Sequence, residues 1–140
     1  VKLLAFKVIL DTNMLMAMAE KRVDIFNQIE NTLGGRTDFI VPRLVLTELL
    51  RISREKSQRG RLAILALKLS EKCHRLDEEP ALEERTDEHI LRVAGEVGGI
   101  VATNDTELLK RVRNANMPAI YIRSDLRVSL EGIDPAYRRK

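Results

Sequence analysis

The chain has 140 residues, which suits one domain and leaves no room for a second core of full size. Hydrophobic residues make up 44% and charged residues 32% of the chain, a composition that excludes a disordered protein. The 24 Lys and Arg residues exceed the 21 Asp and Glu residues, and the net charge of +3 is compatible with a polyanionic partner without predicting one by itself.

Aromatic residues, cysteine and the apolar start of the chain restrict the kind of protein further. With 4% aromatic residues and no Trp, base stacking on an aromatic platform is not expected to dominate any RNA contact. Cys73 is the single cysteine, which excludes an intrachain disulfide and a cysteine-based zinc cluster and favours a reducing, cytoplasmic location. Residues 1–10 are apolar, but Lys7 interrupts them and they are too short to span a bilayer, so we expect a strand and no membrane contact.

Apolar runs that predict strands alternate with stretches that predict helices along the chain. The predicted strands are a first one ending at Leu10, then Asp38–Val41, His74–Leu76, Ile100–Ala102 and Ala119–Ile122. The predicted helices are about 13–33 with a break near Lys21, Leu44–Arg54, a stretch after an interruption at Gly60 with Leu62, Leu65, Ala66 and Leu69 on one face, Thr86–Val97, and one from Asp105 to about Arg113.

This alternation predicts an α/β fold with a mostly parallel sheet covered on both faces. Residues 1–140 are expected to form a single domain, with 123–140 as a C-terminal extension.

Two of the predicted strands run into an acid in a similar pattern. Ile9–Asp11 and Ile100–Asp105 both pass from an apolar run to a carboxylate, the second through a short polar link. Parallel strands end at the same edge of a sheet, where ligands bind in such folds, so these two acids are expected to lie close together. Glu48 lies in the most apolar part of its helix, and Asp87 lies one turn before Ile90 on the face expected to turn toward the sheet.

Each acid also has a purely structural interpretation. Asp11, Asp87 and Asp105 fall near helix starts, where an Asp N-cap contributes about 1 kcal/mol, and Asn104 with Glu107 resembles a capping box. Glu48 has nothing to cap but could pair with Arg51. Considered together, however, converging carboxylates repel one another and have raised pKa values, and a divalent cation such as Mg²⁺ or Mn²⁺ removes that conflict.

The chain resembles the PIN-domain ribonucleases over nearly its whole length. The resemblance is carried by ILDTN at Ile9–Asn13, VPRLVLTEL at Val41–Leu49, TDEHIL at Thr86–Leu91 and IVATNDTEL at Ile100–Leu108. It implies a three-layer α/β/α sandwich with strand order 3-2-1-4-5 and a homodimer. It also implies an acidic, metal-binding and catalytic pocket with three supporting polar residues: Asp11, Glu48, Asp87 and Asp105, then Thr12, Asn13 and Thr103.

Within this superfamily, residues 101–125 and the later Leu130–Gly132 resemble the branch that includes ribosomal-RNA-processing endonucleases more than the toxin of a toxin–antitoxin pair. We therefore expect Mg²⁺- or Mn²⁺-dependent hydrolysis of RNA, with Asp11 and Asp105 as the principal metal ligands. The resemblance suggests products with 5′-phosphate and 3′-hydroxyl ends. The toxin-type ribonuclease remains an alternative.

A run of basic residues is expected to hold the RNA backbone beside the pocket, although a solvated helix face explains it equally well. The run consists of Arg51, Arg54, Lys56, Arg59 and Arg61. A nucleophilic set is not expected, because Cys73 beside His74 is interpreted as an ordinary strand pair and His89 falls off the apolar face that carries Asp87.

Two other functions compete with cleavage of RNA. One is a degenerate PIN module that binds RNA without turnover, which the presence of all four acids disfavours. The other is a phosphotransfer hydrolase with Asp11 as its nucleophile, in which a second acid two residues later is usual. Asn13 occupies that position here, which disfavours this reading.

Overall fold

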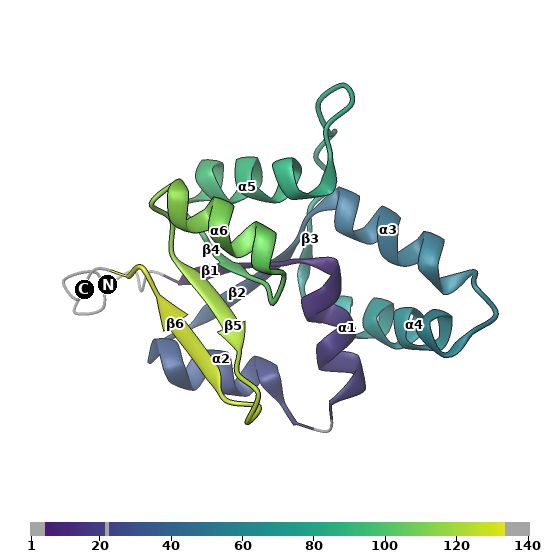
Figure 1. Cartoon of the computed structure of the whole chain (residues 1–140), viewed down its shortest axis with the longest axis horizontal. Helices are drawn as coiled ribbons and strands as arrows, with labels where there is room; N and C mark the ends of the chain where they lie inside the picture. Colours follow the sequence, from purple (N-terminus) through teal and green to yellow (C-terminus); the bar gives the residue numbers. More distant parts are fainter. Residues whose placement is uncertain (1–4, 22, 134–140) are drawn as a thin grey trace.

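A six-stranded sheet forms the centre of the structure, a computed structural model that describes residues 5–21 and 23–133 (Figure 1). The strands are β1 (Phe6–Leu10), β2 (Thr37–Val41), β3 (His74–Arg75), β4 (Ile100–Ala102), β5 (Ala119–Ile122) and β6 (Val128–Glu131). They lie in the order β3-β2-β1-β4-β5-β6, with β1 to β5 parallel and β6 antiparallel to β5. The predicted order 3-2-1-4-5 is confirmed, and β6 continues it.

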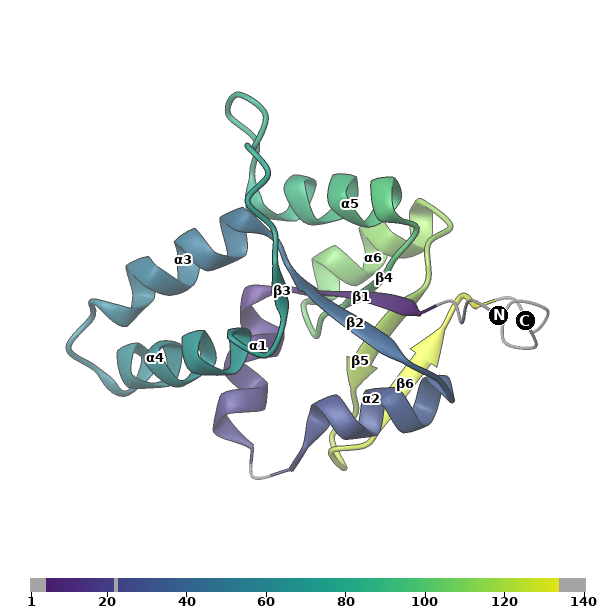
Figure 2. The ribbon, with the colours of Figure 1, turned by 180° about the vertical axis from the view of Figure 1, so that it is seen from behind.

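Helices cover both faces of this sheet, as a three-layer sandwich requires. They are α1 (Thr12–Glu20), α2 (Ile25–Leu33), α3 (Arg43–Ser53), α4 (Gln58–Ser70), α5 (Thr86–Val97) and α6 (Thr106–Asn114). Figures 1 and 2 show α5 and α6 on one side of the sheet and α1 and α2 on the other. Helices α3 and α4 form a hairpin whose connecting turn points away from the sheet. No helix among the described residues has the length and apolar character needed to cross a membrane.

The two central strands are apolar on both faces because both faces are covered. Val8, Ile9 and Leu10 of β1 are fully buried, and Val101 and Ala102 of β4 are buried beside them. Ile9 pairs with Val101 and Leu10 with Ala102, so the two strands end in register at the same edge. This rigid core fixes the positions of Asp11 and of the residues that follow Ala102.

The predictions for α4 are wrong in two respects. Gly60 does not interrupt the helix but lies in its first turn, where its N–H donates to the side chain of the N-cap Ser57. Leu65 is 47% exposed, whereas Ala63 and Ala66 are fully buried. The small side chains on that face let α4 pack closely against α1 and α3, so the buried face follows residue size and not hydrophobicity.

The C-terminal prediction was also incomplete. Residues 128–131 form β6 on the edge of the sheet, whereas the sequence predicts an extension beyond the last strand there. Residues 134–140 of the predicted extension lie outside the described residues.

Replacing Gly60 by Ala is expected to destabilise the α3–α4 hairpin. A Cβ atom at this position would lie 2.0 Å from the backbone oxygen of Glu55, so the backbone of the turn must shift. We expect a loss of about 1–3 kcal/mol in the free energy of unfolding, measured by urea denaturation. Gly95→Ala in α5 is the matched control, because a Cβ there meets nothing within 4 Å and should stabilise the helix by up to about 1 kcal/mol. A stabilising Gly60→Ala would contradict the steric argument.

Candidate functional site

Asp11 lies at the centre of the candidate site, directly after β1, and is only 5% exposed. Its Oδ1 accepts a hydrogen bond of 2.7 Å from the backbone N–H of Met14, which makes Asp11 the N-cap of α1. Its Oδ2 accepts a short hydrogen bond from the hydroxyl of Thr103. Both carboxylate oxygens are therefore oriented by neighbours, one on its own helix and one at the end of β4.

Thr103 connects Asp11 to the second acid of the site. This fully buried residue follows β4, and its hydroxyl oxygen also accepts a hydrogen bond of 3.0 Å from the N–H of Asp105. Asp105 caps α6 through its Oδ1, which accepts from the N–H of Leu108 at 3.0 Å. The predicted convergence of Asp11 and Asp105 at one sheet edge is thus visible in the structure, with Thr103 between them.

Glu48 and Asp87 reach the same place from two other helices. Glu48 is half-buried on α3, and its Oε2 accepts a hydrogen bond of 3.1 Å from the hydroxyl of Thr86, the first residue of α5. Asp87 follows Thr86 and is also half-buried. The bond between Glu48 and Thr86 therefore holds the middle of α3 against the start of α5.

All four acids line one cavity of about 130 Å³, together with Thr12, Asn13, Thr86 and Ile90. The pKa of the Asp11 carboxyl is raised from 3.8 to about 7. Burial is the largest cause, the hydrogen bonds from Thr103 and Met14 oppose the rise, and the charges of Asp105 and Asp87 contribute to it. The pKa of Asp87 is also raised, first by burial and then by the charge of Asp105, with Glu48 adding to the rise. The carboxylates are therefore close enough to repel one another.

The donor chemistry of this cavity fits a hard divalent cation, which prefers carboxylate, hydroxyl and water oxygens. The hydroxyl of Thr12 supports this view, because it is buried at the cavity without any hydrogen-bond partner. Among the described residues, however, no group of three or more His, Cys, Asp or Glu side chains is arranged to hold a metal ion as it stands.

The structural interpretations of the acids are partly correct. Asp11 and Asp105 are N-caps, so each of them serves a helix as well as lining the cavity. Asp87 caps nothing, because α5 begins one residue earlier. The capping box predicted for Asn104 and Glu107 is wrong: the Asn104 side chain instead exchanges hydrogen bonds of 2.7 and 2.8 Å with the backbone of Ile122 at the end of β5.

The basic run predicted to hold RNA lies on α3, on α4 and in the turn between them. None of its five members lines the cavity, and Figure 1 shows the turn between α3 and α4 at a point distant from the sheet. Arg59 is paired with Glu55 at 2.9 Å.

The ion pair with Arg51 that could explain Glu48 in structural terms is not present among the described residues. The side chain of Glu48 accepts a hydrogen bond from Thr86 instead.

His89 is fully buried, contrary to the expectation that it falls off the buried face of its helix. Its Nδ1 lies 2.8 Å from Glu84, which also receives hydrogen bonds of 2.8 and 3.0 Å from Arg92. These bonds from Arg92 are the main reason that the pKa of Glu84 falls from 4.5 to about 2. The cluster fastens the loop before α5 to the helix that carries Asp87.

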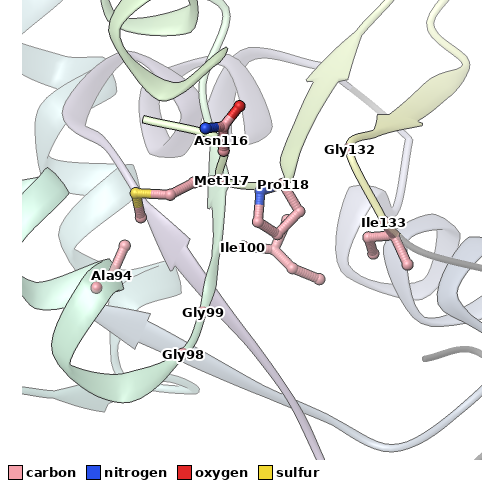
Figure 3. A pocket seen from close by; sticks show the side chains of 10 residues that line it. Ala94, Gly98, Gly99, Ile100, Asn116, Met117, Pro118, Gly132 and Ile133 are labelled. Carbon is pink, nitrogen blue, oxygen red and sulfur yellow. The ribbon is translucent and has the colours of Figure 1, made fainter. Parts of the chain in front are cut away.

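A second cavity, of about 320 Å³, lies at the other end of the strands (Figure 3). Its walls include Gly98, Gly99, Ile100, Met117 and Pro118, and its lining has no titratable side chain. It is therefore not suited to acid–base or metal chemistry, and the smaller acidic cavity is the better candidate for a functional site.

Sequence reasoning missed three residues near the site. Thr86 was predicted only as a helix start, yet it holds Glu48 and lines the acidic cavity. Arg85 and Arg111 line an adjoining cleft that includes Thr86 and Asp87. No motif points to the two arginines, because they come from different helices and carry no periodic pattern.

Comparisons with known proteins give relatives in sequence and in fold. Residues 8–125 match a family described as a PIN-like domain. Ribonuclease VapC9 from Archaeoglobus fulgidus is 30% identical over 129 residues, which is 90% of each chain, and Ribonuclease VapC4 from Methanocaldococcus jannaschii is 28% identical over 84% of this chain and 91% of that protein. The solved structure of the PIN domain endonuclease Utp24 superposes with a TM-score of 0.72 at 24% identity, covering 91% of this chain and 92% of that one.

Proposed function

Because the chain belongs to the PIN-like domain family, we propose that it is a metal-dependent endoribonuclease that hydrolyses phosphodiester bonds of RNA. The observation that carries this proposal is the convergence of Asp11, Glu48, Asp87 and Asp105 on one cavity at the ends of β1 and β4. Two relatives that share sequence with nearly the whole chain are named ribonucleases, which supports the same activity.

In this proposal Asp11 and Asp105 hold Mg²⁺ or Mn²⁺, with Glu48 and Asp87 completing the site directly or through water. A bound ion would supply polarisation of the phosphate and a water of lowered pKa. Thr103 orients Asp11, and Asp11 must release the proton that it retains up to about pH 7 in the metal-free protein before it can act as a ligand. Thr12 and Asn13 would support the first ligand from the start of α1.

The competing functions are weaker on specific grounds. A degenerate RNA-binding module has no need for four acids in one cavity, one of them almost completely buried and repelled by the charges of two others. A phosphotransfer hydrolase lacks the second acid, since Asn13 is exposed and carries no charge. A toxin-type PIN ribonuclease would use the same chemistry and differ in its RNA.

Finer parts of the proposal rest on the resemblance of the sequence. We propose ribosomal RNA as the first substrate to test, a homodimer as the assembly and the cytoplasm as the location. We also propose that RNA contacts the basic run, because its five members are positively charged: Arg51, Arg54, Lys56, Arg59 and Arg61. This contact would lie outside the acidic cavity, since none of the five lines it.

The direct test is incubation of the purified chain with 5′-labelled RNA in the presence of Mn²⁺ or Mg²⁺. We expect the RNA to be cut at internal positions, and we expect this cleavage to stop when EDTA removes the metal. The new RNA ends should carry a 5′-phosphate and a 3′-hydroxyl. Cleavage that continues in EDTA would contradict a metal mechanism, and retention of RNA without cleavage would support the binding module instead.

A second readout does not depend on activity. Mn²⁺ should raise the melting temperature by binding the folded state only, with a shift that grows with metal concentration. The shift should disappear in the Asp11→Asn/Asp105→Asn double variant. Asp24→Asn is the matched control, because Asp24 is also an Asp N-cap but lies on α2 outside the cavity. An unchanged shift in the double variant would mean that the ion binds elsewhere.

A further inference from the structure

An open cleft of about 530 Å³ adjoins the acidic cavity on the side of α5 and α6. Arg85, Thr86 and Asp87 line it from the start of α5, and Glu107 and Arg111 line it from α6. Thr86 and Asp87 also line the acidic cavity, so the two spaces share a wall. An RNA strand bound across the acids can continue into this cleft without leaving the protein surface.

Arg85 and Arg111 are the two cations that line this cleft. Both are exposed, and neither has an ion pair within 4 Å among the described residues, unlike Arg92 or Arg113. Their charges nevertheless act on the site, because both lower the pKa of Asp87 against the effect of its burial. Their guanidinium groups thus have donors available for a ligand that approaches the acids.

We propose that Arg85 and Arg111 form a phosphate subsite that holds an RNA phosphate neighbouring the scissile one. The inference rests on the proposed function and adds which residues position the substrate. Guanidinium groups suit this role because their planar array of donors matches two phosphate oxygens. The RNA backbone would then be gripped on the α5–α6 side of the acids, and not mainly by the basic run on the α3–α4 hairpin.

Glu107 provides an internal check on this assignment. It lines the same cleft, is exposed, and lies 3.8 Å from Lys110 on its own helix. A carboxylate here repels a phosphate, so Glu107→Gln should strengthen substrate binding while the arginine variants weaken it. Opposite signs for Glu107→Gln and for the arginine variants within one cleft are not expected from a general loss of structure.

The test pairs a protein change with a chemical change in the RNA. The wild-type chain and Arg85→Gln/Arg111→Gln are compared on one oligonucleotide whose cleavage position has been mapped, and on copies with a single neutral methylphosphonate linkage near that position. We expect the double variant to lower kcat/KM roughly tenfold at low salt, and the slope of log kcat/KM against log salt to flatten by about 0.7, as for the loss of one phosphate contact on a single strand. At one linkage, the neutral group should cost the wild type roughly tenfold and the double variant almost nothing.

Arg36→Gln is the matched control, since Arg36 is exposed and precedes β2 at the opposite end of the strands. It should behave as the wild type on every oligonucleotide. Equal penalties from the neutral linkage in the wild type and in Arg85→Gln/Arg111→Gln would overturn the subsite while wild-type cleavage upholds the proposed function. Absence of cleavage by the wild type would overturn the proposed function, and this subsite with it.

Discussion

Asp11→Asn is expected to reduce kcat/KM for RNA cleavage by at least roughly 100-fold, because even residues that only support metal ligands cost 10- to 100-fold when they are removed. The substitution replaces the carboxylate that we propose as a metal ligand by a neutral amide, at the most buried acid of the cavity. It preserves the fold, since Asn is also a good N-cap and can still accept the hydrogen bond from Met14. Steady-state cleavage of a labelled oligonucleotide in Mn²⁺ measures the effect.

The control for this experiment is Asp24→Asn, which makes the same chemical change at the N-cap of α2 and should leave cleavage unchanged. Circular dichroism and a melting curve for both variants establish that they are folded. Full cleavage by Asp11→Asn would remove Asp11 from the metal-binding set and would undermine the proposed function.

The metal-free wild type should become more stable as the pH falls from 8 to 5.5, and Asp11→Asn should lose most of this dependence. The folded protein retains a proton on Asp11 up to about pH 7, whereas a carboxyl at its ordinary pKa of 3.8 has released it. Between these values the folded state binds more protons than the unfolded state, so stability falls as the pH rises. The interval from pH 8 to 5.5 reaches about 1.5 units below the raised pKa, so the free energy of unfolding should rise by about 2 kcal/mol as the pH falls.

Urea denaturation in EDTA at pH 5.5, 7 and 8 measures this difference. Glu84 does not disturb the comparison, because its lowered pKa makes a contribution that is present above about pH 4.5 and is lost only as the pH falls toward 2. We expect Asp11→Asn to be more stable than the wild type at pH 8. The difference in free energy of unfolding between the two proteins should be smaller at pH 5.5. Parallel profiles for the two proteins would show that Asp11 is not the group responsible.

The acidic cavity was largely predictable because it follows from a rule about sheets. Two apolar runs that each lead to an acid must deliver those acids to one edge when the strands are parallel and adjacent, as β1 and β4 are. Glu48 could be selected because a charge in the apolar part of a helix needs a partner or a site. The double role of Asp11, as an N-cap and a cavity residue, could not be separated by sequence, since both roles select the same residue at the same place.

Other features depend on contacts that no local pattern encodes. The turn before β6 places Leu126 at a φ of 66°, a conformation for which Gly or Asn is the usual signal, so the β5–β6 hairpin had no recognisable turn sequence. His89 is buried because Glu84 and Arg92 accompany it, and Glu84 comes from the preceding loop and not from the helix period. Arg85 and Arg111 are brought together by the packing of α5 and α6 beside the cleft.

The short strand β3 has a consequence for how copies of this protein can associate. It is two residues long, and both His74 and Arg75 are exposed and polar. An edge that offers so few backbone groups is a poor template for another strand, so continuous sheets running from one molecule to the next are disfavoured on this side. Self-association there must use the surfaces of helices, which resist fibre formation better than an open strand does.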